Sequence, residues 1–152
     1  MTSTLQVRDA IMGAFRAAWL ASPTTSSIPL RWAGVIGDEK PGEQTGGAPP
    51  EGLAKALPWA RASMVHLDGT QETFAAVGQR RYLMSGIFTV QLFTPLGDGH
   101  ALSDLIVAVV KSALRARYAS FWFNNVRQSE VGVDGPWFNV NVDADFFYQE
   151  RE

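Results

Sequence analysis

The sequence predicts an α+β fold: a mostly antiparallel β-sheet flanked by two α-helices in one compact domain. Two segments show the apolar spacing of amphipathic helices, and the segments between and after them alternate like strands. Elements in this segregated order are typical of α+β domains. With 152 residues, 46% of them hydrophobic, the chain can bury one ordinary core but not two. We therefore assign residues 1–152 to a single domain.

The first predicted element is a helix over residues 7–21. Its buried stripe is expected to consist of four apolar residues at four-residue spacing, Val7, Ile11, Phe15 and Trp19. Pro23 follows closely, and the residue before a proline avoids the helical conformation, so the helix should end there. A short extended segment is expected next, over residues 28–33.

Residues 34–52 are predicted to form a flexible loop. Six Gly and three Pro fall within these nineteen residues, and no apolar periodicity is present after Ile36. A loop this long inside a compact domain is commonly functional. We expect it to become ordered against a partner, with a passive insertion as the alternative. Four of its charged residues are candidate interface residues, Asp38, Glu39, Lys40 and Glu43.

A β-hairpin is predicted after the loop. Residues 59–67 alternate in side-chain type, and residues 71–77 are expected to form the return strand. Asp68-Gly69 between them is a favourable two-residue turn, because both turn positions need positive φ. This hairpin should begin a β-meander.

The third and longest strand of the meander is predicted over residues 82–93. Arg80 and Arg81 lie in the connection before it and are two further interface candidates. Ile87 and Phe93 fall among the polar residues of the strand. We therefore expect the polar face of the sheet to be partly covered.

A second amphipathic helix is predicted from about His100 to residue 118, after a Pro/Gly turn. Its apolar face is expected to contain Leu102, Leu105, Ile106, Val109, Val110, Ala113 and Leu114. The charged residues Asp104, Lys111 and Arg115 fall on the opposite side. The preceding turn contains two glycines, but it lacks the third glycine and the lysine that are found in phosphate-binding loops.

The last third is predicted to be β-structure. A short strand is expected over residues 121–123, a second over residues 126–133, and a long final strand over residues 137–148. Asp134-Gly135 should turn the chain between the last two. The final strand alternates so regularly that one of its faces must be buried and the other polar.

Asp143 and Asp145 project together from the polar face of that strand. A solvated strand face is one interpretation, and acid–base work or cation binding is another. A third is an acidic wall that lines a space through which nucleic acid passes, because negative walls do not hold a polyanion.

Composition narrows the classes of function. A net charge of −2 disfavours gripping of a phosphate backbone, and the absence of Cys excludes disulfides and thiolate metal sites. Charged residues are only 18%, beside five Trp, nine Phe and three Tyr. Such a composition is found at the centres of protein interfaces, and equally in an aromatic-rich core. No segment has the length of a membrane span or the pattern of a secretory signal.

No catalytic, cofactor or metal site is predicted. His66 is interpreted as a structural histidine in a strand, because two His in the whole chain are few for a metal centre. His100, Ser103 and Asp104 cluster at a helix start, but neighbouring helical residues do not face each other. Interaction of these polar side chains with the N-terminal end of the helix explains the cluster better than a catalytic arrangement of nucleophile, base and acid does.

Three stretches of the chain share residue patterns with a known family. They are a helix with an extended segment (VRDAIMGAFRAAW, IPLRWAG), a strand, turn and helix (MSGIFTVQLFTPLGDGHALSDLIVAVVKSAL), and a closing strand (WFNVNVDADFFYQ). In this order they resemble the tail terminator (tail completion) proteins of long-tailed bacteriophages and prophages. The loop over residues 34–52 has no counterpart in the pattern.

The resemblance implies a structural virion protein and no enzymatic activity. Such a protein forms a ring, commonly a hexamer, that ends the tail tube, stops tube polymerisation and presents a surface for head joining. The implied partners are further copies of the chain, the tail tube protein and the head–tail connector protein, while DNA passes through unbound. The implied location is the virion tail, after assembly in the bacterial host cytoplasm. A head–tail joining protein is one alternative, and a small-molecule-binding domain or enzyme with a pocket between sheet and helices is another.

Overall fold

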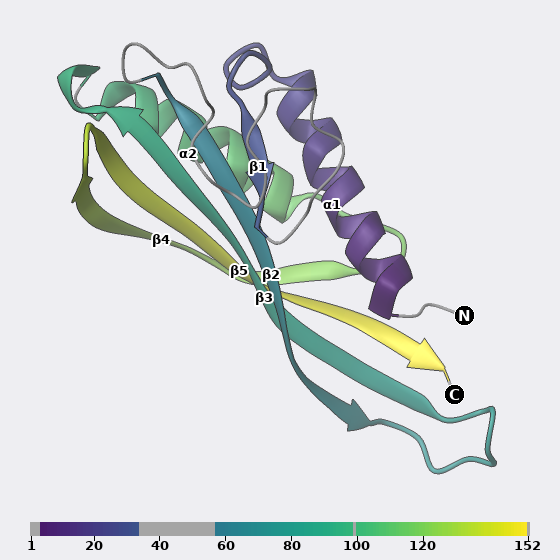
Figure 1. Ribbon diagram of the computed structural model, residues 1–152. Helices are drawn as coiled ribbons and strands as arrows, with labels where there is room; N and C mark the ends of the chain where they lie inside the picture. The colour runs from purple at the N-terminus through teal and green to yellow at the C-terminus, as the bar shows by residue number, and fades with distance from the viewer. Residues whose placement is uncertain (1–3, 34–56, 99, 152) are drawn as a thin grey trace.

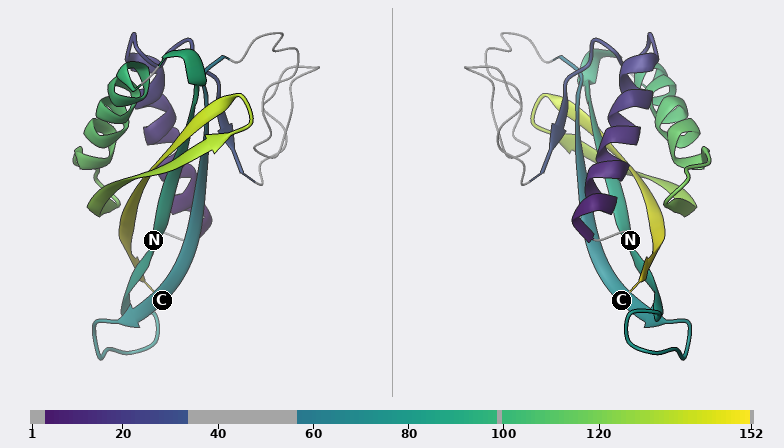
Figure 2. Two further views of the ribbon diagram at one scale, coloured as in Figure 1. Left: turned by 90° about the vertical axis from the view of Figure 1, so that its left-hand side faces the viewer. Right: turned by 90° about the vertical axis from the view of Figure 1, so that its right-hand side faces the viewer.

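A computed structural model describes residues 4–33, 57–98 and 100–151. One five-stranded sheet has the strand order β1-β2-β3-β5-β4, and both helices lie on the same face of it (Figures 1 and 2). The elements in chain order are α1 (Thr4–Ala21), β1 (Leu30–Trp32), β2 (Trp59–Gln71), β3 (Arg81–Pro95), the 3-10 turn η1 (Leu96–Asp98), α2 (Ala101–Arg115), β4 (Trp122–Asp134) and β5 (Trp137–Arg151). The predicted α+β class, with a mostly antiparallel sheet and two helices, is confirmed.

The apolar stripe of α1 is buried as predicted. Val7 and Ile11 are fully buried, and Phe15 and Trp19 are 3% and 2% exposed. The indole Nε1 of Trp19 donates a hydrogen bond to the carbonyl of Ile28 (2.9 Å), which ties the end of the helix to the segment before β1. The helix begins at Thr4, three residues earlier than predicted, and β1 is shorter than the predicted extended segment.

The core lies between the helices and one face of the sheet. β3 and β5 pair without interruption from Arg81 opposite Arg151 to Pro95 opposite Trp137. The predicted alternation of the final strand is confirmed, because the alternate residues Val140, Val142, Ala144, Phe146 and Tyr148 are at most 2% exposed. At roughly 25 cal/mol per Å² of apolar surface removed from water, this layer supplies much of the driving force for folding.

The turn predicted at Asp68-Gly69 and the return strand over residues 71–77 are wrong. β2 passes through an irregularity between His66 and Asp68 and continues until Gln71 pairs with Tyr82. The Asp68 carboxylate accepts the Gly69 N–H within the strand (2.7 Å), so this dipeptide makes a local bond without reversing the chain. The connection between β2 and β3 is residues 72–80.

The two strands predicted over residues 121–123 and 126–133 are one strand, β4. It is interrupted by register shifts between Asn124 and Arg127 and between Glu130 and Gly132. Asn125 has a φ of 53° at the first shift, so the chain bulges where the sequence suggested a break. The turn between β4 and β5 is formed by residues 135–136 and not by Asp134-Gly135.

Helix α2 ends at Arg115, three residues before the predicted end. Four residues of its expected apolar face are buried (Ile106, Val110, Ala113 and Leu114), Leu102 and Val109 are half-buried, and Leu105 is 58% exposed. Val107, which the prediction left out, is buried as well. The predicted loop over residues 34–52, with its interface candidates Asp38, Glu39, Lys40 and Glu43, lies outside the described residues.

Candidate docking arm and outer sheet face

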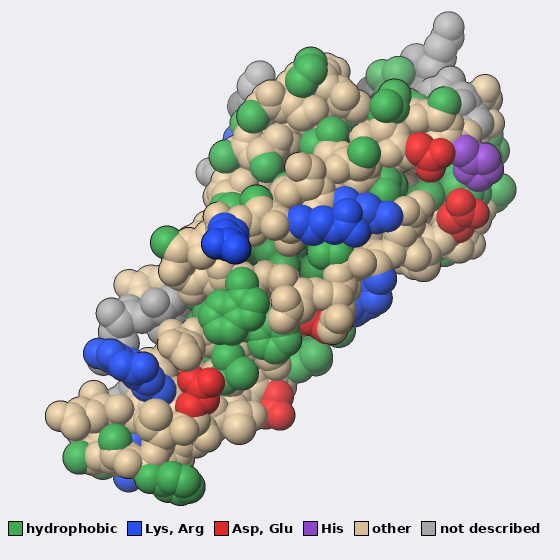
Figure 3. All heavy atoms as spheres, turned by 180° about the vertical axis from the view of Figure 1, so that it is seen from behind, with side chains coloured by type: hydrophobic (Ala, Val, Ile, Leu, Met, Phe, Trp, Pro, Cys, Tyr) green, Lys and Arg blue, Asp and Glu red, His purple; other side chains and the backbone are tan. Residues whose placement is uncertain are grey.

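The sheet continues beyond the helical layer as an arm made of β2, β3 and the loop over residues 72–80 (Figures 1 and 2). Phe74 at the end of the arm is fully exposed, and Val77 is 80% exposed. Val65 and Leu67 on β2 are also more than half exposed. Apolar side chains stand at the end of the arm in the space-filling view (Figure 3). An arm that carries several exposed apolar side chains away from the core is a candidate docking element.

Hydrogen bonds give the arm loop a definite conformation. The Nε of Arg80 donates to the carbonyl of Ala75 (3.1 Å), and the backbone N–H of Arg81 donates to the hydroxyl of Thr73 (3.0 Å). Glu72 in turn donates its N–H to the carbonyl of Arg81 (2.8 Å). These bonds span the loop on both sides of Phe74, so the ring is presented outward by an ordered backbone.

The interface candidates Arg80 and Arg81 therefore lie in the arm beside its apolar tip. Arg80 is half-buried because its guanidinium closes the loop. Arg81 is exposed and stands opposite Arg151 in the β3–β5 pairing, and like charges directly opposite destabilise a strand pair.

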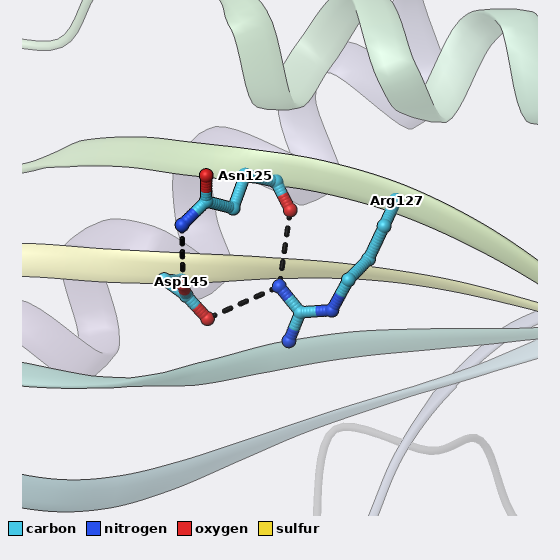
Figure 4. Close-up of polar contacts among 3 residues, drawn as sticks. All are labelled: Asn125, Arg127 and Asp145. Carbon is cyan, nitrogen blue, oxygen red and sulfur yellow. Dashed lines mark hydrogen bonds and ion pairs between the residues drawn. The ribbon is translucent and has the colours of Figure 1, made fainter.

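The sheet face turned away from the helices, here called the outer face, carries a polar cluster (Figure 4). Asp145 on β5 accepts a hydrogen bond from Asn125 Nδ2 (2.9 Å) and forms an ion pair with Arg127 (3.2 Å). Arg127 also donates to the backbone carbonyl of Asn125 (3.0 Å). The bulge in β4 thus turns both Asn125 and Arg127 toward the same carboxylate.

Asp143 and Asp145 do lie together on the outer face, but they do not form a purely acidic surface. Asp143 pairs in register with Thr89 on one side and with Arg127 on the other. Arg61 lies on the same face, so two arginines balance the two aspartates among these described residues. That these aspartates line a lumen stays a prediction, and the wall they would form is close to neutral.

An aromatic cluster covers the other end of the outer face. Trp59 and Phe93 stack with ring centroids 4.2 Å apart, and Trp137 packs edge-on against both. The guanidinium of Arg61 lies over Trp59 and Phe93 at 5.9 and 5.5 Å and donates to Gln91 (2.6 Å). Phe93 is 2% exposed, which confirms that this face is partly covered.

His66 lies on the helical side of the sheet. Its ring packs edge-on against Phe146 and Tyr148, and its Nδ1 lies 3.3 Å from the guanidinium of Arg8. Burial lowers the pKa of His66 below its usual value, and the charge of Arg8 lowers that pKa further. A neutral ring with no carboxylate in its described contacts fits the structural interpretation of this residue.

His100, Ser103 and Asp104 do not converge. The Ser103 hydroxyl donates to the backbone carbonyl of His100 (2.9 Å), while the His100 ring packs edge-on against Phe138. Asp104 is exposed in the first turn of α2, where the helix dipole favours a negative charge. Within the described part of the chain, no group of three or more His, Asp or Glu could hold a metal ion.

Comparisons with known proteins show the fold alone. No family model matches the chain, and no curated protein matches it. A solved structure of a protein that carries no functional name has a TM-score of 0.65 and 16% sequence identity, covering 99% of this chain and 98% of its own. Neither described helix combines the length and the apolar character that crossing a membrane requires. The chain thus shares its whole architecture with a known structure.

Proposed function

We propose that this chain is a tail terminator: copies of it form a ring on the end of a bacteriophage tail tube, stop tube growth and offer a surface for head joining. The observation that carries the proposal is the arm with the fully exposed Phe74 at its tip. An aromatic ring that stays exposed to water contributes none of the free energy that burial of such a side chain normally supplies to folding. Burial of the ring in a partner surface would supply that free energy to binding instead.

The shape of the subunit suits assembly. A ring subunit needs surfaces for its neighbours, and one more for the tube. The arm carries apolar side chains away from the core, and the elongated sheet places its two ends far apart (Figures 1 and 2). The near-neutral outer face, with its paired Arg127 and Asp145, would let DNA slide past without being held. The resemblance of the sequence pattern to tail terminators supplies the identity of the partners.

The proposal is tested by letting the tail tube protein of the same particle polymerise with and without this chain. We expect tubes formed with the chain to be shorter and to carry it at one end only. Unchanged tube lengths, with no chain at the ends, would contradict the proposal. Binding to DNA-filled heads but not to tubes would assign the chain to the head–tail joining role instead. Saturable binding of a small molecule by a strict monomer would favour an enzyme or binding domain.

A further inference from the structure

The hairpin between β4 and β5 ends in an acidic apolar tip, here defined as residues 130–136. Val131 and Val133 are 59% and 70% exposed, and Glu130 and Asp134 are exposed beside them. No Lys or Arg occurs in the sequence between Arg127 and Arg151, so the tip itself contains no cation that could neutralise the two carboxylates. The tip is an apolar surface with negative charge on both sides.

A basic depression lies on the exposed side of α2. It is shallow and open to solvent, and its lining residues all belong to α2 or to the residue that follows it: Ala108, Lys111, Ser112, Arg115 and Ala116. We call it the α2 groove. Among the described residues, no carboxylate lies within ion-pair distance of Lys111 or Arg115. Ala108, Ser112 and Ala116 follow one another at four-residue spacing, with Lys111 and Arg115 in the row beside them. Small side chains and two positive charges therefore share one helix face, which complements the charge of the acidic tip.

The acidic tip of a subunit cannot occupy its own α2 groove. Phe138, just after the tip, packs against His100 at the start of α2, with ring centroids 5.0 Å apart. The groove is centred near Ser112, about 18 Å further along the helix axis at 1.5 Å per residue.

We propose that the acidic tip of one copy docks into the α2 groove of a second copy. Two different surfaces of the same chain are then joined, so the contact is heterologous and adds subunits head to tail. Such contacts close into rings when the rotation between subunits permits. The proposal rests on the assembly of copies in the proposed function, but it does not depend on a tail tube.

The five lining residues of the α2 groove are few beside the roughly 20–30 residues that each partner contributes to a standard protein interface, so we expect a weak contact in solution. A concentration series of ¹⁵N-labelled protein, followed by NMR up to millimolar protein, measures such a contact residue by residue. We expect concentration-dependent shifts confined to residues 108–116 and 130–136. Shifts in neither segment, or shifts in only one of them, would overturn the proposal.

Charge reversals separate this contact from other sources of self-association. Glu130→Lys with Asp134→Lys makes the tip basic, and Lys111→Glu with Arg115→Glu makes the groove acidic. Each double variant should lose self-association by about tenfold or more, because like charges then meet in the contact. An equimolar mixture should associate again, since each tip then fits the groove of the other variant.

A matched control reverses two carboxylates elsewhere, Asp9→Lys with Glu150→Lys, and should associate like the unmodified chain. Failure of the mixture to recover association, or equal loss in the control, would overturn the proposal. If the mixture of the two charge-reversed variants associates but does not cap tail tubes, the contact between copies is supported and the proposed function is contradicted. Shifts of the groove residues on adding a short DNA duplex, without self-association, would show that the groove binds a polyanion instead.

Discussion

Replacing Phe74 with Ser separates the stability of the subunit from its assembly. The side chain is fully exposed at the tip of the arm, and its neighbours in the loop are held by backbone and Arg80 hydrogen bonds that do not involve the ring. Removing the ring therefore takes nothing from the core. We expect the free energy of unfolding to change by no more than about 0.5 kcal/mol, which is usual for surface substitutions.

The effect on assembly should be much larger. A buried aromatic side chain removes about 150–250 Å² from water. At about 25 cal/mol per Å², complete burial of Phe74 in a partner is worth at most about 4–6 kcal/mol. Aromatic residues at the centres of interfaces typically cost about 2 kcal/mol or more when truncated. A loss of 2 kcal/mol corresponds to about a 30-fold weaker affinity for the tube end.

The assay compares thermal unfolding with binding to purified tail tubes for the unmodified chain, Phe74→Ser and a control, Leu20→Ser. Leu20 is 54% exposed at the end of α1, away from the arm. The control should bind like the unmodified chain. A large drop in the melting temperature of Phe74→Ser would show that the ring is packed within the subunit. Unchanged tube binding by Phe74→Ser would refute the role given to the arm.

Three further predictions concern the subunit itself. Gly86→Ala should destabilise the subunit by about 1–3 kcal/mol, because the new Cβ would lie 2.3 Å from the ring of Phe146 and 2.3 Å from the backbone carbonyl oxygen of Val65, which cannot move aside. An unchanged melting temperature would contradict this prediction. A double-mutant cycle on Arg127 and Asp145, measured by urea unfolding, should give a coupling free energy of about 0.2–1 kcal/mol that weakens in high salt. A coupling free energy of zero at low salt would show that this ion pair does not stabilise the fold. The pKa of His66 is lowered in the folded chain, so the unfolded chain takes up this proton first as the pH falls below about 6.5, and the free energy of unfolding decreases on acidification. The variant His66→Gln should therefore lose less free energy of unfolding than the unmodified chain between pH 7.5 and 5.5. Equal losses would show that the His66 ring does not contribute to the pH dependence.

Burial periodicity explains which elements were predictable. One face of α1 and one face of β5 are buried along their whole length. An apolar residue therefore recurs at each turn of the helix from Val7 to Trp19 and at every second residue of the strand, and this periodicity is visible in the sequence. Partial cover of the polar face was also expected, because Ile87 and Phe93 lie there among polar residues; that Trp59 and Trp137 supply the cover at Phe93 was not predicted.

Pairing over long distances explains what was missed. Asp68-Gly69 has the residues of a tight turn, yet it lies within β2 because β3 offers partners as far as Tyr82. The ion pair between Arg127 and Asp145 depends on the extra residues of the bulge, which shift the register in a way that alternation does not reveal. The exposure of Phe74 depends on where the helical layer ends, and no local pattern carries that information.

Electron microscopy of tail tubes incubated with this chain is the decisive experiment for the proposed function. We expect ring-shaped density at one end of each tube, with a central channel and several copies of the chain, and tubes that no longer elongate when more tube protein is added. Bare tube ends that keep growing in the presence of excess chain would contradict it.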